Sequence, residues 1–555
     1  MANRNLTEQV KIGLAMGAIL AALVAFVFAR LKDRAEKNKD AADFIKNTPV
    51  VKIGKWVFNA HQSFMAALLL LALFGTFNYN RYNSNLLLDG YDEYDLLHYY
   101  ISPKYFDEIG YFRLLPAIII ADYESGPMCP KKAPVYLAQD ENDYTRRSVS
   151  HALAQTDEVK SHFTDEKWQE FVHDVTYIQR HSKRLKCFLY RQLLQDHGFN
   201  GTPTWVLIAR PIVKLVPVEF IKLATSLDLL WIIAMLASIV WAFGLETALL
   251  AWIFITISYS FRWPTITWAL LRYDWFATMV IGICMIKKEK NAAGGAFFAY
   301  ATLMRYFPVL WLFGIVAKGV HALITALINK SVLFDTDTWL GVPKRYFKML
   351  GGFAAAMTLL LGLSFAVDGV EPHKASFNNM FAHVEAHNLS SMRQGLQVAL
   401  TYRGETDLKL ISTEKKEMVE ENETIVRIGS LLMMLVLGLF MSRAKDWEVV
   451  GLGLIPYFWL TTSSYYYYSM RMTAVVIHAG DLKKSRNIVG LTILFGIELF
   501  CHAAQYLMPG NRYFLICVMG VLLAIYSLVM MIFLGVEWWK GRRHEPIKEE
   551  VADAR

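Results

Sequence analysis

The sequence predicts an all-α polytopic membrane protein, and this prediction rests on its composition. Of the 555 residues, 55% are hydrophobic and only 19% are charged, whereas a soluble domain carries about 25% charged residues. The mean hydropathy is +0.29. Aromatic residues make up 14% of the chain, as expected where Trp and Tyr gather at membrane interfaces. This composition excludes an ordinary soluble enzyme and a disordered chain.

Charge patterning sets the expected topology of the first part of the chain. An apolar run at 11–29 without a following A-x-A-like cleavage site predicts an anchor helix rather than a removed signal peptide. Residues 1–56 thus comprise this helix and a loop rich in Lys and Arg, which the positive-inside rule assigns to the cytoplasm. A transmembrane helix at 57–77 then carries the chain outward. We interpret the net charge of +8 as topology, since no motif for nucleic-acid binding accompanies it.

Residues 78–218 form a polar segment without a full apolar span, which predicts a large outer, periplasmic loop domain of short helices. The end of this domain, 205–217, is apolar but short, as is typical of a helix lying in the membrane interface. Cys129 and Cys187 both lie in this domain. An oxidising compartment would allow them to form a disulfide, and the alternative is two unlinked thiols.

The rest of the chain alternates between apolar runs and polar loops. Residues 219–367 predict a transmembrane bundle, 368–426 a second outer loop, and 427–537 the C-terminal transmembrane helices. The tail at 538–555 is basic near the membrane and is predicted to be cytoplasmic. At about 20 residues per span, the total is about 13 helices. The expected spans after the outer domain are 219–243, 246–261, 264–286, 292–312, 314–329, 349–367, 427–442, 447–463, 466–480, 488–507 and 513–537.

An acidic cluster opens the outer domain. Asp89, Asp92 and Asp95 follow the second span, and His98 comes three residues after Asp95. Residues three apart share a face of a helix, so we expect Asp95 and His98 to lie together. A carboxylate at this place suits a general base for a hydroxyl nucleophile, and a cationic His beside it suits a phosphate group. The alternative is a solvated acidic loop beside interfacial tyrosines.

The stretch from Asp95 to Tyr111 has the pattern D-x-x-H-Y-Y-x-x-x-K-Y-F-x-E-x-G-Y. It resembles the first outer loop of GT-C-class membrane glycosyltransferases, in particular the polyprenol-phosphate-mannose-dependent GT87 group. The resemblance covers scattered parts of the chain, and the last third is similar to the class only in hydropathy. Further stretches similar to this group lie at 196–205, 272–282, 294–308 and 381–397.

The resemblance implies an integral-membrane enzyme of a bacterial inner (plasma) membrane, with its active site on the periplasmic side. The implied reaction moves mannose, or another hexose or pentose, from a polyprenyl-phosphate-linked donor to a lipid, glycan or protein acceptor, with inversion. It implies that Asp95 is the general base, with Asp92 and Asp89 as competing acids. The partners are then the donor, the acceptor and membrane lipids, and no nucleic acid.

The later outer loop supplies further candidates for substrate and donor-phosphate binding. His387 and Asn388 match a polar pair of the resembled group, and the planar fork of Arg393 fits phosphate oxygens. His383 lies four residues before His387, so a helix would place both on one side. That spacing also suits a metal ion, but no third ligand is evident. Phosphate contact, acceptor positioning and a plain structural pair stay open for these histidines.

Other candidates are ionisable residues near the predicted membrane boundary. Arg471 follows a run of four tyrosines and is placed to meet a donor phosphate or to snorkel to the interface. For Asp122 and Glu124 three alternatives stay open, which are lining the cleft, binding a divalent cation and forming a solvated turn. His197 belongs either to an active-site wall or to the structure of its loop. Charged residues inside predicted spans are expected to face a cavity or a partner helix: Lys222, Asp228, Arg272, Asp274, Arg305, Arg471 and Glu498.

Three other functions remain as alternatives. One is a non-catalytic subunit of a membrane complex built on a degenerate GT-C fold, and another is a transporter or channel, although no internal repeat supports it. The third is an O-antigen-ligase-like enzyme, whose large loop usually comes late in the chain. The chain contains no P-loop, G-x-S-x-G, H-E-x-x-H or C-x-x-C pattern, so ATP-driven, serine-hydrolase and zinc-protease functions have no support.

Overall fold

The computed structural model describes residues 2–35, 49–53, 56–79, 92–130, 135–139, 144–181, 185–261, 268–329, 336–386, 392–405 and 412–543. Helices dominate these residues. The strands found among them form four two-stranded antiparallel ribbons, β1–β2, β3–β4, β5–β6 and β7–β8. The prediction of an all-α membrane protein is confirmed at this level.

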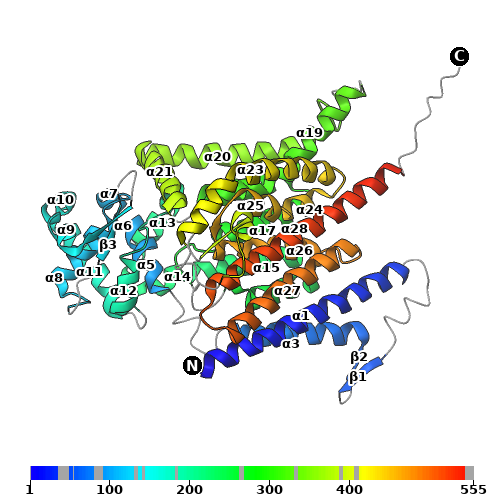
Figure 1. Ribbon diagram of the computed structural model, residues 1–555, viewed down its shortest axis with the longest axis horizontal. Coiled ribbons are helices and arrows are strands. Elements are labelled where there is room, and N and C mark those ends of the chain that lie inside the picture. The colour runs from blue at the N-terminus through cyan, green and yellow to red at the C-terminus, as the bar shows by residue number, and fades with distance from the viewer. Residues whose placement is uncertain are drawn as a thin grey trace.

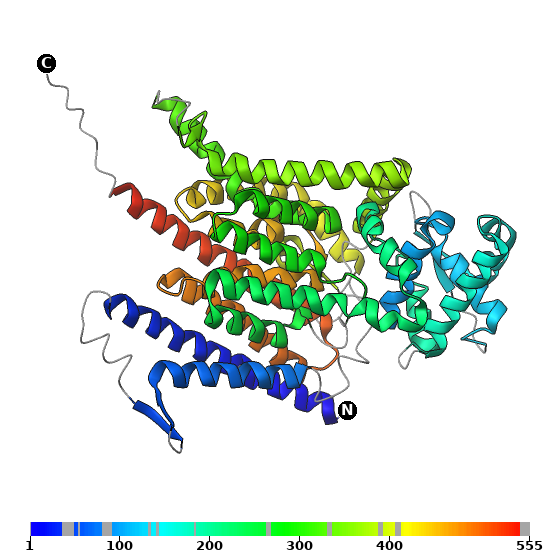
Figure 2. The ribbon, with the colours of Figure 1, turned by 180° about the vertical axis from the view of Figure 1, so that it is seen from behind.

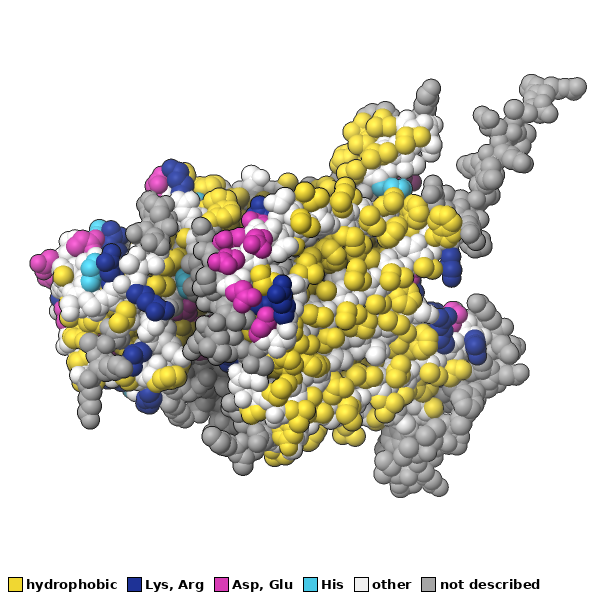
Figure 3. Space-filling model, in the orientation of Figure 1, with side chains coloured by type: hydrophobic (Ala, Val, Ile, Leu, Met, Phe, Trp, Pro, Cys, Tyr) yellow, Lys and Arg dark blue, Asp and Glu magenta, His cyan; other side chains and the backbone are white. Residues whose placement is uncertain are grey.

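Within the described part of the chain, eight helices are long and apolar enough to cross a membrane. Their apolar windows have mean hydropathies from 1.5 to 2.7. A helix satisfies its own backbone hydrogen bonds, which hydrocarbon cannot do, so these runs fold as helices and direct many Leu, Val and Phe side chains outward. Hydrophobic side chains accordingly cover most of the bundle face seen in Figure 3. The eight spans are Leu6–Arg34, Ala60–Tyr79, Val218–Phe243, Phe307–Ile328, Lys344–Asp368, Glu417–Met441, Ser485–Leu507 and Arg512–Gly541.

The other predicted spans are short helices or pairs of short helices. Among the described residues of the run predicted at 264–286, the α-helix covers Asp274–Lys287. The run at 447–463 forms two helices, Asp446–Gly451 and Leu454–Leu460. A 14-residue helix is about 21 Å long, less than the hydrocarbon thickness of about 30 Å. The count of about 13 spans therefore stays a prediction.

The bundle and its connections are built from consecutive helices, with short 3₁₀ turns and ribbons at their ends. The helices are α1 (Ala2–Ala35), α3 (Ala60–Tyr79), α14 (Ile221–Thr225), α15 (Leu227–Phe243), α16 (Leu245–Ile257), α17 (Asp274–Lys287), α18 (Asn291–Arg305), α19 (Phe313–Ile328), α20 (Lys344–Asp368), α21 (Glu371–Ala386), α22 (Leu396–Leu400), α23 (Ser412–Met441), α24 (Asp446–Gly451), α25 (Leu454–Leu460), α26 (Arg471–Ala479), α27 (Ser485–Leu507) and α28 (Arg512–Arg543). The strands and 3₁₀ turns are β1 (Pro49–Ile53), β2 (Trp56–Asn59), β5 (Thr338–Trp339), β6 (Val342–Pro343), β7 (Arg393–Gln394), β8 (Ser463–Ser464), η1 (Val218–Phe220), η2 (Tyr259–Phe261), η3 (Phe307–Leu312) and η5 (Tyr465–Met470).

The described residues between the second and third long spans form short helices and one ribbon, and we call the described residues 92–217 the outer domain after the side of the membrane expected for them. Figures 1 and 2 show it at one end of the bundle, whereas β1–β2 and the end of the last helix, at Arg543, lie at the opposite end. Its elements are α5 (Glu93–Tyr99), α6 (Ile101–Lys104), α7 (Phe106–Ile109), α8 (Leu114–Ser125), β3 (Val135–Gln139), β4 (Tyr144–Ser148), α9 (Val149–Leu153), α10 (Thr156–Lys160), α11 (Asp165–His181), α12 (Cys187–Leu193) and α13 (Pro203–Leu215).

A disulfide joins Cys129 to Cys187 in the outer domain, with their Cα atoms 5.3 Å apart. This distance lies well within the range that a disulfide requires, so the pairing predicted as one of two alternatives is confirmed. The bond ties the segment after α8 to the start of α12. Cys284, Cys501 and Cys517 are buried and form no disulfide in the described part of the chain, which agrees with a packing role.

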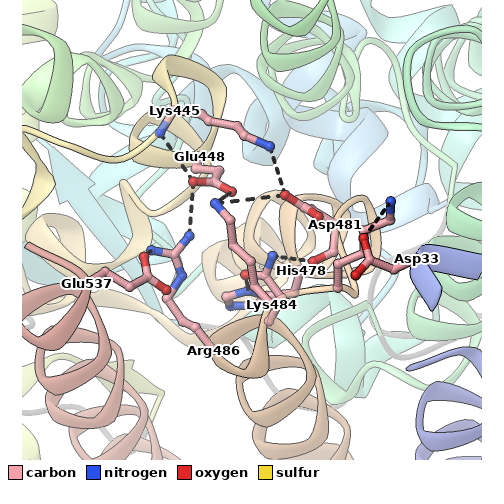
Figure 4. A network of polar contacts seen from close by, with 10 residues as sticks. Asp33, Lys445, Glu448, His478, Asp481, Lys484, Arg486 and Glu537 are labelled. Carbon is pink, nitrogen blue, oxygen red and sulfur yellow. Dashed lines mark hydrogen bonds and ion pairs between the residues drawn. The ribbon is translucent and has the colours of Figure 1, made fainter. Parts of the chain in front are cut away.

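The turns at the far end of the bundle are held by a network of ion pairs (Figure 4). Glu448 on α24 is fully buried and lies 2.6 Å from Lys484 Nζ and 3.0 Å from Arg486 Nη2. Arg486 also lies 2.8 Å from Glu537 on α28. A buried carboxylate needs such partners to offset its loss of hydration. The network thus connects α24, α27 and α28 at the end opposite the outer domain.

Candidate functional site

A cavity of about 750 Å³ lies where the outer domain meets the bundle. Its walls come from α5, the loop after α12, the loop before α17, the end of α18 and the segment around β7, β8 and η5. Five of the residues predicted from the sequence line this one cavity: Asp92, Asp95, His98, His197 and Arg393.

The acidic cluster lies on α5 and its first turn. Asp92 precedes the helix in an extended conformation, and its backbone N–H donates to the Trp268 carbonyl over 2.7 Å. This bond fixes the start of α5 against the loop before α17. Asp92, Asp95 and His98 follow one another at intervals of three, and all three line the cavity. The shared face expected from this spacing is therefore present.

Arg272 joins the acidic cluster to the bundle. Its Nη1 lies 3.2 Å from Asp92 Oδ2, and its Nη2 contacts the Asp95 carboxylate. The loop that carries Arg272 is fixed by Asp228, a fully buried residue of α15. The Asp228 carboxylate accepts hydrogen bonds from the backbone N–H groups of Ala269 and Arg272, over 2.9 and 2.8 Å. Arg272 thus offsets part of the negative charge of the acid pair and holds its position.

A second polar group lies beside the acid pair. Asp196 accepts a hydrogen bond from the Tyr94 hydroxyl over 2.8 Å and one from the His197 backbone N–H over 2.9 Å. Burial alone would raise the pKa of Asp196, but the bonds from His197 and Tyr94 and the nearby His98 ring lower that pKa below its usual range. Asp196 is therefore ionised at neutral pH.

Burial of His98 works against the cationic form of the ring that we expected. Its exposed fraction is 4%, and burial lowers the pKa of its imidazole despite the neighbouring carboxylates. Among the described residues, no group makes a hydrogen bond with His98 Nε2. A neutral ring still binds a ligand oxygen through an N–H, but as a hydrogen-bond donor without a full charge.

The wall facing the outer domain is basic and aromatic. Arg305, at the end of α18, has no carboxylate within ion-pair distance in the described part of the chain, and its guanidinium lies 5.7 Å from the centre of the Tyr99 ring. Arg393 lies in β7, which pairs with β8 through Ser464, and is only 5% exposed. Tyr466 and Tyr467 lie within electrostatic range of both guanidinium groups. Two guanidinium groups and phenol hydroxyls are typical partners of a phosphate.

Three of the remaining predicted residues, Arg471, Asp122 and Glu124, do not line the cavity. Arg471 is fully buried behind the cavity wall, where it pairs with Glu498 over 2.8 Å and donates to Ser260 Oγ. Asp122 and Glu124 lie within the outer domain, outside the cavity. Asp122 accepts from the Met128 backbone N–H over 3.0 Å, and burial raises its pKa to about 6.

Glu124 has structural partners of its own. It accepts from Trp168 Nε1 over 2.8 Å and pairs with Lys160. Asp89, His387 and Asn388 lie outside the described residues. His383 belongs to α21, but its side chain also lies outside the description. In the part of the chain that the structure describes, no group of three or more His, Cys, Asp and Glu residues is arranged to hold a metal ion.

Several lining residues were not among the predicted site residues. The sequence does indicate a role for Arg272 and Arg305, because charged residues in apolar runs are costly and usually face a cavity. Tyr465, Tyr466 and Tyr467, which belong to the run of four tyrosines before Arg471, also line the cavity.

No known protein family, curated protein or solved structure matches this chain.

Proposed function

We propose that the chain is an inverting GT-C-type glycosyltransferase that moves a sugar from a polyprenyl-phosphate-linked donor to an acceptor on the outer side of the membrane. The observation that carries this proposal is the division of the cavity into two walls of opposite chemistry. The outer domain contributes the carboxylates Asp92, Asp95 and Asp196, and the opposite wall contributes Arg305 and Arg393. Such a cavity suits a reaction between a hydroxyl nucleophile and an anionic leaving group.

The basic wall is the proposed phosphate site. Arg305 and Arg393 come from elements of the bundle side, so a phosphate held there can keep its polyprenyl chain among the membrane helices. Guanidinium groups bind phosphate oxygens through charge-assisted hydrogen bonds. Because both are already in place, they can stabilise the negative charge that develops as the phosphate leaves. His98 adds a neutral N–H donor to the same cavity.

The acidic wall is the proposed acceptor site. Asp95 takes the proton of the acceptor hydroxyl as that oxygen attacks the anomeric carbon of the donor sugar. The bond between the anomeric carbon and the phosphate oxygen breaks, and the polyprenyl phosphate leaves with the electron pair. Attack from the side opposite the phosphate inverts the anomeric centre. Asp92, which shares Arg272 with Asp95, is the competing base.

The proposal also includes the more specific features that the family resemblance implies. They are a GT-C fold with about 13 spans of about 20 residues each, a bacterial inner membrane, a periplasmic active site and mannose or another hexose or pentose as the sugar. The basic turns at the end opposite the outer domain, such as Lys445 and Lys484 (Figure 4), support the orientation.

The test is sugar transfer by the full-length chain in proteoliposomes. Labelled polyprenyl-phosphate mannose, and the same lipid carrying other hexoses or pentoses, would be supplied with a membrane glycolipid extract as acceptor. The proposal expects labelled product and free polyprenyl phosphate in equal amounts from at least one donor. Absence of transfer and of donor binding with every sugar would overturn it and favour a non-catalytic subunit.

A further inference from the structure

The tyrosines of η5 differ in exposure, and Tyr466 and Tyr467 are the two that are not fully buried. Tyr465 and Tyr468 are 1% and 0% exposed, and the Tyr468 hydroxyl donates to the Gln394 carbonyl. Tyr466 is 37% exposed and lines the cavity together with Tyr467. A belt that anchors a protein in the membrane interface would direct its rings toward lipid headgroups. The cavity-facing pair therefore calls for another explanation.

Tyr467 is fixed from behind by other aromatic rings. Its ring centre lies 5.1 Å from that of Phe307 and 5.9 Å from that of Trp275, with interplanar angles of 67° and 66°. Edge-to-face contacts of this kind are favourable and hold the ring in one orientation. Tyr466 lies next to it, with 4.6 Å between the two ring centres. The two phenols thus form a supported aromatic platform inside a polar cavity.

The position of this platform relative to the charged groups is specific. Tyr466 and Tyr467 are within electrostatic range of both Arg305 and Arg393, and Tyr466 also lies within range of Tyr94 on the acidic wall. The platform therefore lines the same cavity as the proposed phosphate site and the proposed general base. In a transfer from such a lipid, the sugar ring lies between the leaving phosphate and the attacking hydroxyl of the acceptor.

We infer that the sugar ring of the donor stacks on Tyr466, with Tyr467 supporting it, while the phosphate is held by Arg305 and Arg393. This inference rests on the proposed function and adds the residues that hold the sugar. The C–H face of a pyranose is weakly positive and packs against the electron-rich face of an aromatic ring. Binding pockets commonly combine such apolar contacts with a few polar groups that fix orientation.

The experiment measures binding of two lipids to the full-length chain in nanodiscs. One is polyprenyl phosphate without a sugar, and the other is its mannosyl ester. Tyr466→Ala should weaken binding of the mannosyl lipid about tenfold, equivalent to about 1.4 kcal/mol, and leave binding of the sugar-free lipid unchanged. Tyr466→Phe, which keeps the ring, should stay within about twofold of the native chain, less than about 0.4 kcal/mol.

Tyr506→Ala serves as the matched control, because Tyr506 is 36% exposed and lies outside the cavity. It should bind both lipids as the native chain does. Equal loss of both lipids in Tyr466→Ala would assign the phenol to the phosphate site and overturn the inference, as would unchanged binding of the mannosyl lipid. If the native chain binds neither lipid, the proposed function fails first and the inference fails with it.

Discussion

Arg272 Nη1 lies 3.2 Å from Asp92 Oδ2, although the two residues are 180 positions apart in the chain. The same guanidinium contacts Asp95. Asp92 and Asp95 belong to the outer domain, and Arg272 belongs to the loop before α17, so one side chain joins the two halves of the cavity. This contact makes the geometry of the acidic wall depend on the bundle.

Removing Arg272 should therefore disturb both stability and the site. Arg272→Ala leaves two carboxylates, whose side chains are only 11% and 16% exposed, without their cation. For buried pairs such a loss costs about 3–5 kcal/mol, and because this pair keeps some contact with water, we expect the lower end of that range. Arg272→Lys should recover only part of the loss, since an ammonium cannot bridge two carboxylates as a planar fork does. Thermal unfolding of the purified chain measures the effect.

Arg427→Ala provides the control for that measurement. Arg427 pairs with Glu423 on α23, but the two side chains are 74% and 42% exposed. Pairs of this kind contribute about 0–1 kcal/mol. A loss of stability in Arg272→Ala no larger than in Arg427→Ala would show that the link between Arg272 and the acid pair does not hold the two parts together.

The basic wall predicts a salt-sensitive lipid-phosphate site. Arg305→Gln and Arg393→Gln should each weaken binding of polyprenyl phosphate by about tenfold to a hundredfold, because a charge-assisted hydrogen bond is worth about 1.5–3 kcal/mol. Added salt should weaken binding further in the native chain than in either variant. Titration of the lipid phosphate into nanodiscs at two salt concentrations measures both effects, and indifference of both variants would refute the phosphate assignment.

The topology can be tested with introduced cysteines. Glu166 is exposed on α11 of the outer domain, and Glu289 is exposed in the turn between α17 and α18. A cysteine at Glu166 should react with an impermeant thiol reagent in intact cells, whereas one at Glu289 should react only after permeabilisation. The reverse pattern would place the cavity on the cytoplasmic side and contradict the proposed orientation.

Because Asp122 is buried, we expect the stability of the outer domain to depend on pH. Burial raises its pKa from the ordinary 3.8 to about 6, so between these pH values the folded chain retains a proton that the unfolded chain has lost. Stability from this group therefore falls as the pH rises through that window, by about 3 kcal/mol in total, and is constant above it. Asp122→Asn removes the titration.

The measurement is thermal unfolding of the native chain and of Asp122→Asn between about pH 4 and about pH 7. This range covers the window between the ordinary and the raised pKa of Asp122. The stability of the variant relative to the native chain should increase steadily up to about pH 6 and then level off. Parallel curves for the two proteins would mean that Asp122 titrates at its ordinary value.

Parts of the site that lie close together in the sequence could be predicted from it. Asp92, Asp95 and His98 are spaced by three residues, so a single helical turn was sufficient to bring them together. Their charge state was harder to predict, because the neutral form of His98 results from burial by distant segments. Arg393 was predicted from its chemistry and a family resemblance rather than from spacing.

The opposite wall depends on tertiary contacts that local patterns do not contain. Arg272 and Arg305 were recognised as charges in apolar runs, but nothing in their neighbourhoods indicates which segment they face. Tyr466 and Tyr468 are alike in sequence, and only the turn of η5 directs the first into the cavity and the second into the core. Long apolar runs predicted spans well, whereas runs interrupted by Asp274 or by Gly453 became shorter helices.

The most direct test of the central claim is the rate of sugar transfer by Asp95→Asn. This substitution keeps the size of the side chain but removes its basicity, and loss of a general base typically lowers turnover about 10²–10⁴-fold. The account predicts a rate at least a hundredfold below that of the native chain, with donor-lipid binding nearly unchanged, and a smaller effect in Asp92→Asn. Near-normal transfer by Asp95→Asn would contradict the assignment of Asp95 as the base.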